Sequence, residues 1–170
     1  MSVLQEGNPV CALTAGDIGG QYLTFRIAGE EYGIAIRHVH EIIGTLPTAH
    51  IPRVPDFVRG VINLRGKIIP IIDMRLRLAM ESKEDTDKSC IIVVDVRGRN
   101  GKVTMGFVAD EVSEVLDITS SEIEDAPEFG AQFDTAFLLG IAKVKGQVKI
   151  LIDINKILGG DEISQLSNLA

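Results

Sequence analysis

The chain contains the stretch Gly60-Val-Ile-Asn-Leu-Arg-Gly-Lys-Ile-Ile-Pro-Ile-Ile-Asp73, and a later stretch, Gly140-Ile-Ala-Lys-Val-Lys-Gly-Gln-Val-Lys-Ile-Leu-Ile-Asp153, repeats its pattern. The glycines, the basic residue of the turn and the final aspartate coincide at an offset of 80 residues (140 − 60). In each stretch, apolar runs flank a basic residue and a glycine, which is the pattern of a β-hairpin. The repeat therefore predicts two halves of similar structure.

A second pair of segments supports the duplication. Tyr32-Gly-Ile-Ala-Ile-Arg-His-Val-His-Glu41 aligns with Met105-Gly-Phe-Val-Ala-Asp-Glu-Val-Ser-Glu114 at an offset of 73 residues (105 − 32). The two offsets differ by seven residues (80 − 73), so we expect the second half to contain a longer loop, within the polar stretch 128–135.

Further hairpins are expected on both sides of these repeats. Tyr22 to Ile27 alternates apolar and polar residues, and a turn at Gly29-Glu30 leads into a strand from Tyr32 to Ile36. Asn100-Gly101 lies between two apolar runs and is a strong hairpin signal. Four hairpins in one chain favour small β-barrels over a parallel sheet.

Helices are expected only as short connectors and at the end of the domain. Val39, Ile42 and Ile43 have helical spacing, and so do the residues at 112, 115 and 116 of the second half. Asp153 is a suitable N-cap for a helix over 154–158, which Gly159-Gly160 would end.

The fold class that follows is all-β, with two SH3-like five-stranded barrels related by internal duplication, short connector helices and a C-terminal helix. Barrels of roughly 60 to 70 residues are marginal alone, so we expect them to share a core. The expected divisions are a flexible segment 1–19, a first barrel over about 20–86, a second over about 87–160, and a tail 161–170. The repeat leaves open whether the barrels are sequential or exchange strands, and a groove between them is the expected ligand site.

Composition excludes several classes of protein. The 170 residues are 45% hydrophobic, which excludes a disordered chain, and 17 basic against 24 acidic residues give a net charge of −7. That sign argues against a nucleic-acid partner, including a tandem SH3-like RNA binder suggested by Lys145-Gly-Gln-Val148. No apolar run approaches the roughly 18 to 20 residues of a membrane-spanning helix. No basic residue precedes Arg26, and Cys11 and Cys90 have no metal or redox spacing, so a cytoplasmic protein is expected.

No group of residues indicates catalysis, a metal or a cofactor. Asp73 and Asp153 are equivalent by the repeat and suggest a hydrolase with paired carboxylates, but neither is followed by the Thr or Ser and Gly of an acid protease. Helix capping or a turn hydrogen bond is the favoured role for both. The stretch 60–67 fails as a phosphate loop in glycine spacing, and His38, His40 and His50 have no metal-site pattern.

Charge is distributed unevenly along the chain. The stretch 51–78 has six basic and two acidic residues, whereas 109–134 has nine acidic residues and no basic one. Such segments are often only solvated faces, but opposite charges on two halves suit electrostatically steered assembly. A binding module is therefore expected.

The motifs closely resemble those of the CheW family of bacterial chemotaxis coupling proteins. The resemblance is carried by Asn63-Leu-Arg-Gly66, Ile69-Pro-Ile-Ile-Asp-Met-Arg75, Glu31-Tyr-Gly-Ile34 and Val39-His-Glu-Ile42 in the first half, and by Gly106-Phe-Val-Ala-Asp-Glu-Val112 and Ala126-Pro-Glu-Phe129 in the second. It implies two SH3-like barrels without catalysis, metal or cofactor. The expected partners are the cytoplasmic hairpin tip of chemoreceptors and the regulatory domain of the histidine kinase CheA. Other copies in a membrane-associated receptor array are a further expected partner.

The resemblance also implies site residues. The receptor-binding groove would involve Val39, Glu41, Gly60, Asn63, Leu64 and Arg65. Opposite charge predicts that Arg65 pairs with Glu41 and holds the groove's wall in shape. Exposed apolar residues, Leu46 and Ile51, are the candidates for kinase contacts. The alternative left open is a tandem SH3-like module reused in another two-component signalling complex.

Overall fold

The computed structural model describes residues 18–98, 101–125 and 136–158. Its strands are β1 Gly20–Ile27, β2 Glu30–Ala35, β3 Val39–Gly44, β4 Val58–Leu64, β5 Lys67–Asp73, β6 Cys90–Gly98, β7 Gly101–Ala109, β8 Glu111–Ile118, β9 Ile123–Glu124, β10 Leu138–Val144 and β11 Gln147–Ile152. Short 3-10 turns, η3 Ile36–His38 and η4 Ser120–Glu122, precede β3 and β9. The helices are α1 Met74–Arg77 and α2 Ile154–Leu158. The predicted all-β class is confirmed.

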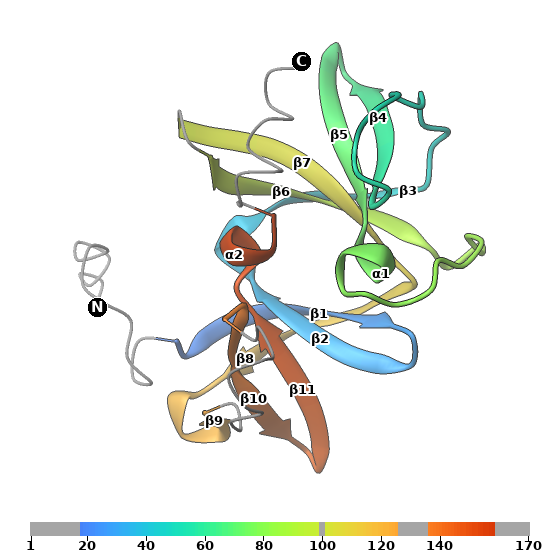
Figure 1. Ribbon diagram of the computed structural model, residues 1–170. Helices are drawn as coiled ribbons and strands as arrows, with labels where there is room; N and C mark the ends of the chain where they lie inside the picture. The colour runs from blue at the N-terminus through green and yellow to red at the C-terminus, as the bar shows by residue number, and fades with distance from the viewer. Residues whose placement is uncertain (1–17, 99–100, 126–135, 159–170) are drawn as a thin grey trace.

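The strands form two sheets. One has six strands in the order β8-β1-β2-β11-β10-β9, and the other has five in the order β3-β6-β7-β5-β4. Figure 1 shows the two sheets on opposite sides of the molecule, with α1 and α2 between them. The short helices therefore lie near the junction of the two subdomains.

The sheets do not divide the chain at residue 86. The hairpin β1–β2 joins the strands of the second half, and the hairpin β6–β7 joins β3, β4 and β5. Each hairpin is joined on both sides, by the antiparallel pairings β1–β8 and β3–β6 and by parallel contacts that place Gly33 opposite Leu151 and Gly106 opposite Ile71. Of the two arrangements that the sequence left open, sequential barrels over 20–86 and 87–160 or strand exchange, the sheets have the exchanged one. A hairpin can pair with either half because both halves offer the same strand edge.

The repeat is visible in matching details of the two sheets. Both β4 and β10 have a register shift just before a repeat glycine, Gly60 or Gly140. The backbone N–H of Asp73 donates to Phe57 O (2.6 Å), and that of Asp153 donates to Phe137 O (2.7 Å). The duplication predicted from the sequence thus extends to single hydrogen bonds.

The equivalent aspartates begin the two helices. The carboxylate of Asp73 accepts from Leu76 N (3.2 Å) at the start of α1, and that of Asp153 accepts from Asn155 N (3.0 Å) at the start of α2. Both bonds fill backbone donors that the first turn of a helix leaves free. The predicted helix over 154–158 and the predicted capping role are confirmed.

The predicted hairpin turns between β4 and β5 and between β10 and β11 are also confirmed. Arg65 and Gly66 both have positive φ (52° and 89°), as do Lys145 and Gly146 (54° and 79°). Two positive φ values give the turn whose twist matches that of the flanking strands.

The predicted connector helices at 39–43 and 112–116 are wrong. These residues lie in β3 and β8, which pair with β6 and β1. A helix of about one turn is unstable because it forms too few hydrogen bonds to offset the cost of nucleation. Val and Ile are instead favoured in paired strands. Segments 1–17, 99–100, 126–135 and 159–170 lie outside the described residues. The predictions that fall on them concern most of the flexible segment 1–19, the longer loop, Asn100, Gly159-Gly160 and the tail.

One hydrophobic core lies between the two sheets, as expected for two small barrels. Phe25 of β1 and Phe107 of β7 are fully buried, and their ring centroids are 5.2 Å apart. Ile154 and Ile157 of α2 complete this core. A smaller cluster around Tyr22 fills the six-stranded sheet. Sharing one large core compensates for the small area that each barrel could bury alone.

A polar contact also joins the subdomains. Arg75 of α1 donates two hydrogen bonds to Asp110, from Nε to Oδ1 (3.2 Å) and from Nη2 to Oδ2 (2.6 Å). The backbone N–H of Ala28, in the β1–β2 turn, donates to the same carboxylate (3.0 Å). Asp110 therefore connects the exchanged hairpin to the five-stranded sheet.

Candidate functional site

The six residues proposed for receptor binding come from the two edges of the five-stranded sheet. Val39 and Glu41 lie on the edge strand β3. Gly60, Asn63 and Leu64 lie on the opposite edge strand β4, and Arg65 begins its turn into β5.

An ion pair between Arg65 and Glu41 connects these edges. Arg65 Nη2 donates to Glu41 Oε1, so the predicted pairing is confirmed. For this contact to form, the sheet must curl until β3 and the β4–β5 turn are neighbours. The Arg65 side chain is 67% exposed and that of Glu41 is 24% exposed. An ion pair this exposed contributes at most about 1 kcal/mol to stability, so its main effect is on the shape of this surface.

Asn63 fixes the turn that presents Arg65. Its Oδ1 accepts a hydrogen bond from the backbone N–H of Gly66 (2.8 Å). This is a local turn bond of the kind that Asn favours. Asn63 is exposed, whereas Leu64 is half-buried and packs against the core, so Leu64 anchors the start of the turn.

Gly60 is buried and acts through its backbone. It has φ of +143°, and a Cβ at this position would lie 2.1 Å from Ala49 O. Its neighbour Val61 exchanges two hydrogen bonds with Ala49, of 2.9 Å and 3.0 Å. Because Gly60 has no side chain, the segment around Ala49 can lie directly against the backbone of β4. It supports the surface and is not itself exposed for contact.

Sequence reasoning missed a polar network that adjoins the pair. His40 Nδ1 lies 3.3 Å from Asp95 Oδ2, and Thr104 Oγ1 donates to Asp95 Oδ1 (2.7 Å). Lys67 Nζ in turn donates to Thr104 (3.3 Å). Burial alone would raise the pKa of Asp95, but the bonds from Thr104 and His40 outweigh it and lower that pKa. No sequence signal links these residues, because they lie on four different strands.

The two kinase-contact candidates lie in the segment between β3 and β4. Leu46 is 44% exposed, as expected for a contact residue. Ile51 is half-buried rather than exposed, and so it offers less apolar surface than expected. Ile42 of β3 and Ile68 of β5 are exposed to 43% and 39%, and the sequence reading did not single them out.

Comparison with known proteins identifies the family. The family model described as the CheW-like domain matches residues 21–162. The chain belongs to the CheW family. The chemotaxis protein CheW of Klebsiella aerogenes is 37% identical over 161 residues, which cover 95% of each chain. The chemotaxis protein CheW of Bacillus subtilis is 36% identical over 141 residues, covering 82% of this chain and 87% of that protein.

A solved structure of the CheW family agrees with the fold. The crystal structure of the scaffolding protein TtCheW from Thermoanaerobacter tengcongensis is similar with a TM-score of 0.73 and 34% identity. The match covers 85% of this chain and 96% of that one. The two sheets are thus the two SH3-like β subdomains of a CheW protein. None of these three names describes an enzyme.

Within 18–98, 101–125 and 136–158, no three His, Cys, Asp or Glu side chains gather where they could hold a metal ion. No helix among the same residues has the length and apolar character needed to cross a membrane.

Proposed function

We propose that this protein is a non-enzymatic adaptor that couples transmembrane chemoreceptors to the histidine kinase CheA. The observation that carries the proposal is membership of the CheW family across residues 21–162. The relatives are named as chemotaxis and scaffolding proteins, which fits a role in a signalling assembly.

The proposed receptor-binding surface is the edge surface, defined as the exposed and half-buried part of the six candidate residues: Val39, Glu41, Asn63, Leu64 and Arg65. It combines half-buried apolar residues with charged groups around them, as protein interfaces commonly do. Gly60 supports it from below through its contact with Ala49. A receptor hairpin would contact this surface, and the ion pair would hold its two sides in register.

The proposed kinase-binding surface is the segment around Leu46 and Ile51. Exposed Leu46 would provide an apolar anchor for the CheA regulatory domain. Assembly with receptor and kinase would recruit this protein from the cytoplasm to membrane-associated arrays. Other copies of the chain are a further partner there.

Calorimetric titration tests the receptor arm. The purified full-length chain is titrated with a receptor cytoplasmic hairpin from the same genome, and Arg65→Glu is compared with Lys145→Glu. Lys145 occupies the equivalent turn of the second half and has the same backbone conformation, so it is a matched control. We expect binding at tens of micromolar or tighter, roughly tenfold weaker for Arg65→Glu, and unchanged for Lys145→Glu. Equal affinity for all three proteins would show that the edge surface is not the receptor site.

A second titration, with the CheA regulatory domain, tests the kinase arm. Leu46→Asp places a charge in the proposed interface and should weaken kinase binding without changing receptor binding. Val148→Asp changes a similarly exposed apolar residue of the other subdomain (55% exposed, against 44% for Leu46) and should affect neither. Failure of the unmodified chain to bind either partner would refute coupling and favour another two-component complex.

A further inference from the structure

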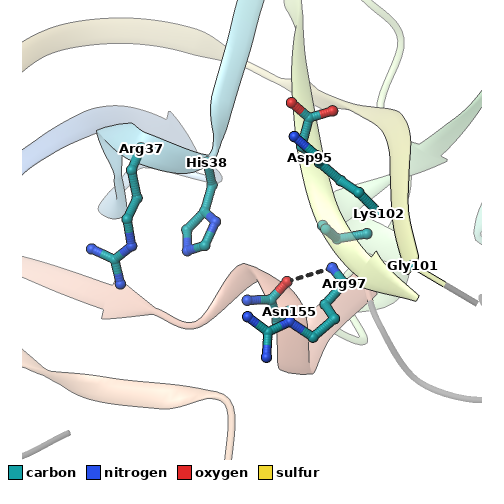
Figure 2. Close-up of a pocket in the computed structure, with 8 residues that line it drawn as sticks. Arg37, His38, Asp95, Arg97, Gly101, Lys102 and Asn155 are labelled. Atoms are coloured by element: carbon teal, nitrogen blue, oxygen red, sulfur yellow. Dashed lines mark hydrogen bonds between the residues drawn. The ribbon is translucent and has the colours of Figure 1, made fainter. Parts of the chain in front are cut away.

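A cavity of about 520 Å³ opens at the junction of the two subdomains. Figure 2 shows Arg37 and His38, from the η3 turn that joins the two sheets, on one side of it. Asp95, Arg97 and Lys102, from β6 and β7, lie opposite. Asn155 of α2 closes the base. The pocket therefore exists only where the two subdomains and the second helix meet.

The walls of this pocket are cationic although the whole chain carries a net charge of −7. Arg37, Arg97 and Lys102 bring three positive charges, against one negative charge from Asp95. Asp95 is already engaged by His40 and by the hydroxyl of Thr104.

The three cations of the pocket act on their neighbours through space: Lys102 lowers the pKa of Asp95, and Arg37 and Arg97 lower the pKa of His38. None of them makes an ion pair with a residue in the described part of the chain, whereas Arg26, Arg59 and Arg75 do so elsewhere. Guanidinium groups are planar donors that bind carboxylates in pairs of parallel hydrogen bonds. Cations that make no salt bridge and line a concave site are thus suited to bind an anionic group of a partner molecule.

Neutral donors in the pocket are also arranged for an acceptor. Asn155 Oδ1 accepts from the backbone N–H of Arg97 (2.8 Å), which leaves the amide NH₂ of Asn155 as a donor. Burial lowers the pKa of His38, and Arg37 and Arg97 lower it further, while Asp153 and Asp95 act in the opposite direction. A further anion near His38 would stabilise its protonated imidazole and offset the two arginines.

We propose that this pocket binds an acidic side chain of the receptor segment that contacts the edge surface. The inference rests on the proposed function. His38 directly precedes Val39, and Asp95 of the pocket wall bonds His40, next to Glu41, so the pocket lies beside the edge surface. The net charge of −7 disfavours an acidic partner over the chain as a whole, so a cationic pocket would determine where its carboxylate binds. A carboxylate in the pocket would thus fix the position of the receptor relative to both subdomains.

Charge removal tests the pocket by calorimetric titration with the receptor cytoplasmic hairpin. Arg97→Gln and Lys102→Gln should each weaken binding roughly threefold to tenfold and reduce its dependence on salt. Lys102→Arg keeps the charge and should bind nearly as well as the unmodified chain. Lys156→Gln removes the same charge from the exposed residue next to Asn155, outside the pocket, and should leave affinity unchanged. Chemical denaturation of each variant confirms that the fold is retained.

The outcomes separate this inference from the proposed function. If the unmodified chain does not bind the receptor cytoplasmic hairpin, both the coupling function and the proposed role of the pocket are refuted. If it binds, and Arg97→Gln and Lys102→Gln bind as tightly, only the pocket inference is overturned. Weakening by Lys156→Gln to the same extent would also overturn it, because the effect would then come from net charge alone.

An NMR titration of the His38 ring measures its pKa, which would not change on receptor binding if the pocket residues had only a structural role. Saturation with the hairpin should raise the pKa of His38, because a bound carboxylate stabilises the imidazolium. Millimolar inorganic phosphate without the hairpin should raise it much less. A shift with phosphate but none with the hairpin would assign the pocket to a free small anion and refute a receptor carboxylate.

Discussion

Gly106 of β7 lies opposite Ile71 of β5 in a parallel contact between strands from the two halves of the chain. A Cβ at position 106 would lie 2.8 Å from Ile91 Cγ2 and 3.0 Å from Ile71 Cδ1. The equivalent contact in the other sheet places Gly33 opposite Leu151, where a Cβ would lie 2.9 Å from Leu151 Cδ2. Each parallel contact between exchanged strands therefore has a glycine at the same point of the repeat, where a side chain would overlap its neighbours.

Gly106→Val should destabilise the protein by about 1 to 3 kcal/mol, because the added atoms overpack the contact between β7 and β5. The measurement is the free energy of unfolding from chemical denaturation. Gly44→Val is the matched control, since Gly44 also lies on a strand and a Cβ there meets nothing within 4 Å. Similar losses for the two variants would contradict the packing explanation.

Exchanging the charges of Arg65 and Glu41 should restore part of the stability that each single change removes. Arg65→Glu places two carboxylates side by side, and Glu41→Arg places two cations together, so each should cost at most about 1 kcal/mol. The double variant re-forms the pair with reversed polarity. A double-mutant cycle measures the coupling, and a coupling energy of zero would show that the pair does not act on the fold.

Acid should remove the stabilising contribution of Asp110. Burial acts to raise its pKa, but hydrogen bonds from Arg75 and the backbone N–H of Ala28 lower it below the usual 3.8. The unfolded chain then takes up this proton first as the pH falls, so the contribution is present above about pH 4 and is lost as the pH falls through the folded-state pKa.

Asp110→Asn should accordingly cost about 1 to 3 kcal/mol at neutral pH and reduce the loss of stability in acid. Unfolding free energies across the acid range check both effects. Asp117→Asn removes an exposed carboxylate of β8 that makes no ion pair within the described residues, and it should change neither quantity. An unchanged acid profile in Asp110→Asn would be inconsistent with this assignment.

His38 should reduce stability in mild acid. Its pKa is lowered from 6.5, chiefly by burial and then by Arg37. Because the unfolded state is protonated first, stability should fall as the pH falls below about 6.5 and should level off below the folded-state pKa. His38→Gln should flatten this part of the profile, and Arg37→Gln should raise the NMR-measured pKa of His38. A pKa of His38 at or above its ordinary value would contradict the prediction.

Local features of the fold were predictable because they depend on residues close in the sequence. The turn at Arg65-Gly66 needs only a residue tolerant of positive φ and a glycine between apolar runs. The capping of α2 by Asp153 needs only a short polar side chain before a helical segment. The helical spacing in β3 and β8 predicts helices that do not form, because these segments are stabilised by pairing with distant strands.

The candidate site was only partly predictable for the same reason. Arg65 and Glu41 carry opposite charges within recognisable motifs, so their pairing could be expected. The cationic pocket combines Arg37, Arg97 and Asn155, which share no motif and meet only through packing of the subdomains.

The sequence by itself determined the duplication, the hairpins, the capped second helix and the family, since each is written in spacing and residue type. Only the tertiary structure decided which half each hairpin completes, because both halves carry the same apolar pattern and present equivalent edges. In the structure, each hairpin completes the sheet of the other half, and strands from opposite halves pack closely at Gly33 and Gly106. The pocket at the junction is a consequence of that choice.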